Sequence, residues 1–192
     1  MGNIIESFEI KIITYFIRFD DFSKNFFYED RFIKWNDKTK NPWGLKFKPL
    51  ARYNKETVEI DVFEEKELTG NVDIHYLDYN TAKPDDVDFE SKFTFDLSHL
   101  KHMPAPLKIY GVVGHFSIDF GNGLTLNTSP SSTATHWKQS VLMFSNPIDH
   151  DCKLKNELMT KIDCKRAMNG RDLDIKIEFP DNDNFAEHFS LI

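Results

Sequence analysis

The chain has 192 residues, a length that suits one domain or one domain with an appendage. Its 40% hydrophobic and 29% charged residues are typical of a globular protein and exclude a disordered one. The 18 phenylalanines favour β-structure, because large rings suit a half-buried pleated surface. A net charge of −7 argues against a nucleic-acid-binding protein and favours a basic protein or peptide as a partner.

No segment near the start is typical of a targeting or membrane sequence. The longest apolar stretch there, Ile12–Ile17, is far shorter than the roughly 20 residues that a membrane span needs. Glu6 and Lys11 interrupt any secretory signal. Two cysteines, Cys152 and Cys164, exclude a disulfide scaffold or a four-cysteine zinc site. We therefore expect an intracellular protein in which both thiols are free and buried.

The first third of the chain gives the weakest structural signals. Residues Ile10–Phe19 could form a strand, but the first 25 residues match no recognisable pattern and are left unassigned. Between residues 44 and 67, apolar side chains are scattered among charged ones. We expect this second segment to be an excursion from the main body of the fold.

The remainder of the chain predicts strands. Phe89, Phe93 and Phe95 alternate with polar residues, which is the period of a half-buried strand. In the β-rich segment Leu107–Phe120, two glycines at 111 and 114 indicate a bulge or a close backbone approach. Further strands are expected at Thr135–Phe144, Leu158–Lys165, Asp172–Phe179 and Phe185–Leu191.

Turn signals separate these expected strands. Gly121-Asn122-Gly123 and Asn169-Gly170 predict tight hairpins, because these residues accept positive φ at low cost. A proline-containing loop is expected at His102–Pro106 and a turn at Asn146-Pro147. Gly121-x-Gly123 lacks the third glycine and the following helix of a phosphate-binding loop. Strands joined by such turns predict a mainly β fold, an antiparallel sandwich or barrel.

Two pairs of polar residues could carry chemistry, but a structural role is the stronger hypothesis for each. His99 and His102 have the spacing of a metal-binding pair, yet no acidic or cysteine partner is suitably spaced, so we expect a surface loop and no metal. Asp172 and Asp174 fall on one face of a strand and could act as paired carboxylates. Outward-facing charges are the commoner explanation for such a pair.

The segment Thr135-His136-Trp137 precedes an apolar run and is the strongest candidate site. An imidazole can relay a proton near neutral pH, and an indole ring offers its face to a cation. The alternative is a tryptophan that packs and a histidine that caps a turn.

Two motifs resemble the barrel domain of protein arginine methyltransferases. These are Thr-His-Trp-Lys-Gln-Ser-Val at residues 135–141 and Asn-Gly-Arg-Asp-Leu-Asp-Ile at residues 169–175. The resemblance extends over Phe27–Ile192 and is strongest over Asn127–Phe179. It implies an arginine-methyltransferase-like barrel at residues 26–192, with an inserted, helical dimerisation arm at residues 44–67.

Family members place an S-adenosylmethionine domain before the barrel, and its motifs do not occur in this chain. Neither a Gly-x-Gly-x-Gly turn nor a Ser-Glu-x-Met-Gly loop is present. The complete family enzyme transfers a methyl group from S-adenosylmethionine to the guanidinium of protein arginines. The resemblance therefore implies that this chain alone binds no cofactor and is inactive.

The resemblance also implies roles for Thr135, His136 and Trp137 as substrate-binding residues. In the family this loop faces the mouth of the active site, where the histidine supports catalysis by pairing with an acidic residue of the other domain. The tryptophan helps to wall the arginine channel. The implied substrates are proteins with basic Gly/Arg-rich segments, and the implied location is the cytoplasm or the nucleus.

Two hypotheses remain open. In the first, the chain is the substrate-binding and dimerisation part of an arginine methyltransferase, and its arm pairs with another subunit of the same or a different kind. In the second, it is a stand-alone, non-catalytic barrel that regulates an intact methyltransferase or binds basic peptides.

Overall fold

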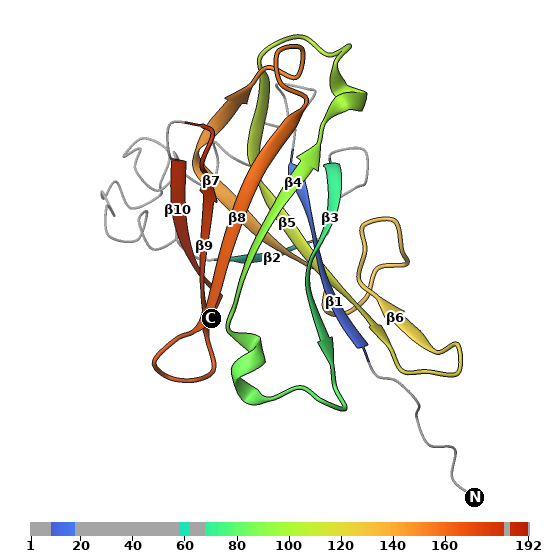
Figure 1. Cartoon of the computed structure of the whole chain (residues 1–192). Coiled ribbons are helices and arrows are strands. Elements are labelled where there is room, and N and C mark those ends of the chain that lie inside the picture. Colours follow the sequence, from blue (N-terminus) through green and yellow to red (C-terminus); the bar gives the residue numbers. More distant parts are fainter. Residues whose placement is uncertain (1–8, 18–57, 62–67, 183–184, 192) are drawn as a thin grey trace, which may run out of the picture.

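The computed structural model describes residues 9–17, 58–61, 68–182 and 185–191 (Figure 1). These residues form two antiparallel sheets. In the first sheet the strand order is β2-β7-β5-β1-β3, and β6 also pairs with β5. Its strands are β1 (Glu9–Ile17), β2 (Glu59–Asp61), β3 (Leu68–Asp78), β5 (Leu107–Asp119), β6 (Thr125–Asn127) and β7 (Gln139–His150).

The second sheet has the order β10-β9-β8-β4. Its strands are β4 (Phe89–Asp96), β8 (Glu157–Arg166), β9 (Leu173–Phe179) and β10 (Phe185–Leu191). Two short 3₁₀ helices, η3 (Pro84–Val87) and η4 (Ser98–Leu100), flank β4 along the chain. The predicted mainly antiparallel β architecture is confirmed.

The two sheets approach each other at both sides. β3 and β4 lie side by side on one side, and β7 approaches β10 on the other (Figure 1). At this second junction the Val58 N–H donates to the Ser190 carbonyl over 3.0 Å, and the Ser145 N–H donates to the Glu187 carboxylate over 2.8 Å. These bonds join the sheets into a barrel-like body.

Several local predictions are confirmed by the backbone. β4 alternates between more and less buried residues along its whole length. Gly121, Asn122 and Gly123 all have positive φ in the turn from β5 to β6, and Gly170 has φ 70° in the turn from β8 to β9. The expected loop at 102–106 is also present, between η4 and β5.

The predicted turn at Asn146-Pro147 is wrong, since both residues lie inside β7. The pairing of β5 with β7 shifts register here: Ile109 pairs with Ile148, whereas Gly111 pairs with Met143. The proline therefore falls in a bulge, where a strand residue needs no ladder N–H. A bulge of this kind depends on the partner strand. The proline in the sequence therefore does not distinguish a bulge from a turn.

Gly111 lies beside this irregularity and confirms the predicted close backbone approach. A Cβ atom there would press into the carbonyl oxygen of Leu142 and lie 3.0 Å from the Met143 Cα. Both contacts are to backbone, so a side-chain rotation cannot relieve them.

We expect Gly111→Ala to lower the free energy of unfolding by about 3 kcal/mol, because the extra methyl must force β5 and β7 apart. Urea denaturation of the purified variant measures the effect. Gly114→Ala is the matched control, since a Cβ there meets nothing closer than 3.9 Å, and we expect a change below about 1 kcal/mol. Equal losses in the two variants would contradict the close-approach explanation.

The N-terminal segment contributes a central strand. β1 lies within the first 25 residues, which the sequence left unassigned, and it pairs with β3 on one side and β5 on the other. Glu9 is paired with both Asp78 and Asp119. The sheet therefore begins well before residue 26.

Only residues 58–61 of the predicted arm are described, and they are not helical. Residues 59–61 form the short strand β2 on the edge of β7, and Val58 is buried in the core. The helical prediction is thus wrong for these residues, because pairing with β7 and burial of Val58 hold them extended. The remainder of the segment at 44–57 and 62–67 lies outside the described residues.

An aromatic cluster fills the core where β7, β9 and β10 meet. The Phe144 ring lies 5.5 Å from that of Phe179 and 5.2 Å from that of Phe185, both in edge-to-face geometry. Phe189 packs against the same ring, at 6.5 Å. Phe144 and Phe179 are fully buried, so the phenylalanine-rich composition is used here to join the two sheets.

Candidate functional site

The Thr-His-Trp segment forms a turn immediately before β7. The Lys138 N–H donates to the Thr135 carbonyl over 3.3 Å, which places His136 and Trp137 at the centre of the turn. Lys138 has φ 53°, a left-handed conformation that is uncommon for a residue with a side chain. The strand expected to begin at Thr135 therefore begins at Gln139. The four residues before Gln139 form the turn.

The turn exposes one large ring while holding it in place. Trp137 is 56% exposed, yet its ring stands edge-to-face against Phe116 of β5 at 6.3 Å. The exposed imidazole of His136 lies 6.2 Å from the Trp137 ring. The Thr135 hydroxyl is buried and has no hydrogen-bond partner among the described residues. All three predicted site residues are thus brought together, two of them facing solvent.

A buried hydrogen-bond network fixes the base of this loop. The Thr128 hydroxyl donates to the Phe116 carbonyl and accepts from the Phe116 N–H, each over 3.0 Å. The Gln139 side-chain amide donates to the Thr128 carbonyl over 2.7 Å. Both Thr128 and Gln139 are buried, so the loop between them leaves and re-enters the sheet at fixed points.

Sequence reasoning missed these supporting residues. Gln139 belongs to the motif that carries the resemblance, but nothing in its local pattern distinguishes a buried glutamine from a surface one. Phe116 belongs to a strand distant in sequence, so its contact with Trp137 is a tertiary one.

The sequence matches a known family over most of its length. Residues 17–184 match the family model described as the arginine methyltransferase oligomerization subdomain. The chain belongs to the protein arginine methyltransferase family. The resemblance drawn from the two motifs is therefore confirmed.

Curated relatives support the same family assignment. Protein arginine N-methyltransferase 1 of Dictyostelium discoideum is 30% identical over 164 residues, which are 82% of this chain and 43% of that protein. Protein arginine N-methyltransferase 1 of Chlamydomonas reinhardtii is 29% identical over 126 residues, 62% of this chain and 34% of that protein. The chain thus spans less than half the length of these relatives.

Solved arginine methyltransferases share the fold. The Trypanosoma brucei PRMT1 enzyme–prozyme heterotetrameric complex with AdoHcy matches with a TM-score of 0.73 and 24% identity, over 96% of this chain and 56% of that one. Arabidopsis thaliana protein arginine methyltransferase 10 matches with a TM-score of 0.70 and 17% identity, over 97% of this chain and 60% of that one.

The other candidate residues lie in turns, strands and a short 3₁₀ helix away from the Thr-His-Trp turn. His99 lies in η4, and within the described ranges no group of three or more His, Cys, Asp or Glu residues is arranged to hold a metal ion. Asp172 accepts the Asn169 amide in the β8–β9 turn, while Asp174 accepts the Ser190 hydroxyl over 3.2 Å. The two carboxylates serve different contacts and form no pair.

The two thiols are buried, as predicted. Burial raises the pKa of Cys164 to about 11, and it also raises the pKa of Cys152 above its usual value. A thiol with a raised pKa is a poor nucleophile at neutral pH. No helix in the described part of the chain is long and apolar enough to cross a membrane.

Two buried histidines of the methyltransferase barrel have pKa values below the ordinary 6.5. His115 on β5 and His150 on β7 are 5% and 8% exposed, and burial is the main cause of the lower pKa in both. His150 Nε2 lies 2.8 Å from the Lys155 carbonyl, so it carries the proton and donates it. Burial therefore favours the neutral form of both side chains in the folded state.

Stability should fall as the pH drops from about 7.5 to about 5.5, because the unfolded state takes up protons near pH 6.5 that the folded state excludes. The expected slope is at most about 1.4 kcal/mol per pH unit for each histidine. Urea midpoints across this range measure it. His150→Gln retains an amide donor without the titration, so its slope should be smaller, and an unchanged slope would exclude His150 as the cause. Surface carboxylates such as Asp88 and Glu178 have pKa values below 3.8 and 4.5 and titrate outside this range.

Proposed function

We propose that this chain is the oligomerisation and substrate-facing barrel of a protein arginine methyltransferase, which transfers methyl groups from S-adenosylmethionine to arginine side chains of proteins. The observation that carries the proposal is the exposed Trp137 ring on an anchored turn, within a chain of this family. A tryptophan face attracts a guanidinium group through a cation–π interaction.

The neighbouring residues support this role. His136 is exposed beside Trp137, where it can reach a carboxylate supplied by another domain. The hydrogen-bond network of Gln139 and Thr128 holds the base of the turn in one geometry. The net charge of −7 favours basic Gly/Arg-rich protein segments as substrates. The family resemblance favours a cytoplasmic or nuclear location.

The proposed domain comprises residues 26–192, and β1 from the preceding segment supplies the strand between β3 and β5. The family description names oligomerisation, and a structural neighbour is a heterotetrameric complex. We propose that the segment at 44–67 contributes to dimerisation, in its parts outside residues 58–61. The Gly-x-Gly-x-Gly and Ser-Glu-x-Met-Gly motifs do not occur in the chain, so S-adenosylmethionine is expected to bind only where another domain supplies them.

The test is a gain of activity. The cofactor-binding part of the Dictyostelium relative, placed before this chain, is expected to methylate a Gly/Arg-rich peptide with radiolabelled S-adenosylmethionine. The isolated 192-residue chain should incorporate no label and should show no saturable cofactor binding in calorimetric titration. Micromolar cofactor binding by the isolated chain would contradict the proposal that another domain binds S-adenosylmethionine. A folded, cofactor-binding fusion that remains inactive would contradict the substrate-facing role.

A stand-alone regulatory barrel is the second candidate. The structural neighbour described as an enzyme–prozyme heterotetramer shows that this fold occurs in assemblies of unlike subunits. This function predicts that the isolated chain binds an intact family methyltransferase and changes its rate. Size-exclusion chromatography with light scattering, followed by an activity assay of the mixture, distinguishes the two candidates.

A further inference from the structure

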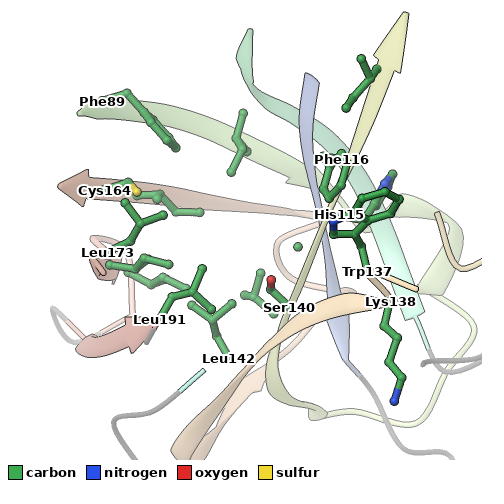
Figure 2. Close-up of a pocket in the computed structure, with 17 residues that line it drawn as sticks. Phe89, His115, Phe116, Trp137, Lys138, Ser140, Leu142, Cys164, Leu173 and Leu191 are labelled. Carbon is green, nitrogen blue, oxygen red and sulfur yellow. The ribbon is translucent and has the colours of Figure 1, made fainter. Parts of the chain in front are cut away.

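A cavity of about 450 Å³ lies between the two sheets, and its lining is apolar (Figure 2). Strands of both sheets contribute to it: Val112 and Phe116 come from β5, Leu142 from β7, Ile162 from β8 and Ile175 from β9. Among the described lining residues none is acidic. The cavity is therefore lined by the apolar side chains of both sheets.

The polar groups among the described lining residues favour an uncharged ligand. Ser140 contributes a hydroxyl, Cys164 a thiol and His115 an imidazole, whose pKa is lowered by burial so that its neutral form is favoured. Burial raises the pKa of Cys164 to about 11, so the thiol stays protonated at neutral pH. Figure 2 shows the Lys138 side chain extending away from the other lining residues. A charged ligand would lose its hydration without gaining a partner.

The cavity has a route to solvent and room for a ligand of definite size. Trp137 and Phe116 lie at one end, and Phe89 and Cys164 at the other (Figure 2). Because Trp137 is 56% exposed, its end of the cavity reaches the surface. Apolar cavities stay dry, and one of roughly 150 Å³ accepts benzene, so this one has room for about three rings. Ligand pockets of roughly 300–1,000 Å³ are typical of small-molecule sites.

We propose that the barrel interior is a binding site for one uncharged, apolar small molecule of about two or three rings, which enters past Trp137. The edge-to-face pair of Trp137 and Phe116 supplies aromatic surface at the entrance. Bound ligand would rest against the ring that the Thr135–Lys138 turn presents. The cavity shares Trp137 with the proposed substrate-facing surface, but binding inside it does not require methyl transfer.

The uncharged fluorophore N-phenyl-1-naphthylamine tests the proposal on the full 192-residue chain. We expect a saturable rise in its emission with a stoichiometry of one. At pH 8, where the neutral form of His115 is favoured, the anionic analogue 8-anilino-1-naphthalenesulfonate should bind at least tenfold more weakly, because the Lys138 side chain extends away from the other lining residues (Figure 2). An absence of saturable binding by the uncharged probe, or equal binding of the two probes, would overturn the proposal.

Filling the cavity should abolish binding. Gly114 lines it, and a Cβ there would lie 3.9 Å from the Ser140 carbonyl, so Gly114→Leu can extend into the space without a backbone clash. We expect at least a tenfold loss of probe affinity in this variant. Thr94→Leu introduces the same side chain at an exposed position of β4 and should bind as the unchanged chain does. Undiminished binding by a folded Gly114→Leu protein would place the probe elsewhere.

A chemical measurement locates the probe without any variant. Cys164 lines the cavity and Cys152 is not among its lining residues, although both are 5% exposed. Saturating probe should slow modification of Cys164 by methyl methanethiolsulfonate at least threefold, and leave the rate at Cys152 unchanged. Mass spectrometry of the two peptides gives both rates. Equal slowing at both cysteines, or none at Cys164, would contradict binding inside the barrel.

Discussion

Replacing Phe144 with alanine is expected to lower the free energy of unfolding by about 3–5 kcal/mol. Phe144 is fully buried and touches the rings of Phe179, Phe185 and Phe189, so its removal leaves a void where the two sheets join. For a chain of this size the loss corresponds to a melting temperature lower by about 6–20 °C. Urea and thermal denaturation followed by circular dichroism measure both quantities.

Leu154→Ala is the control for this truncation. Leu154 is 87% exposed, so its shortening should change stability by no more than about 0.5 kcal/mol. A loss below about 1 kcal/mol for Phe144→Ala would mean that the surrounding rings collapse into the void. The aromatic cluster would then contribute less to joining the sheets than its contacts indicate.

His136→Ala should reduce kcat by about 10²–10⁴ in the fusion that carries a cofactor-binding domain. The proposed histidine–carboxylate pair orients the site in the transition state, so its loss should affect kcat more than peptide binding. In the isolated chain the same change should leave the melting temperature unaltered, because the imidazole is exposed. Steady-state kinetics of the fusion and a thermal melt of the isolated chain are the two measurements.

Trp137→Ala is the companion variant, with a different expected signature. A lost cation–π wall of roughly 0.5–2 kcal/mol should act on the bound guanidinium and raise KM about 2- to 30-fold, with a smaller change in kcat. Trp137→Phe should restore part of the affinity. If His136→Ala destabilises the isolated chain by several degrees and leaves the kcat of the fusion intact, then His136 is a structural residue.

Much of the fold was predictable because its signals are local. The alternation along Leu173–Phe179 and the glycines at 121, 123 and 170 determine strand and turn geometry without reference to distant residues. The two motifs at 135–141 and 169–175 led to the correct family for the same reason: each is a contiguous run.

The features that sequence analysis missed are tertiary. Pro147 lies within a strand because the partner strand permits a bulge, and Thr135 starts a turn because Gln139 and Thr128 fix the loop from below. Residues 59–61 pair with β7, but the charged and irregular sequence around them does not predict a strand. The cavity is lined by residues of strands from both sheets, so no single strand reveals it.

The place of β1 has a consequence for how the chain folds as it is made. Its two neighbours are synthesised far apart in time, since Glu9 pairs with Asp78 on β3 and with Asp119 on β5. At about 5–20 residues per second, roughly 100 residues after β1 require about 5–20 s of translation. Throughout this interval β1 has an unsatisfied edge, which is a template for pairing with other chains. Among the described strands, β1 therefore waits longest for its second neighbour, and chaperone protection of this segment during translation should raise the yield of folded protein.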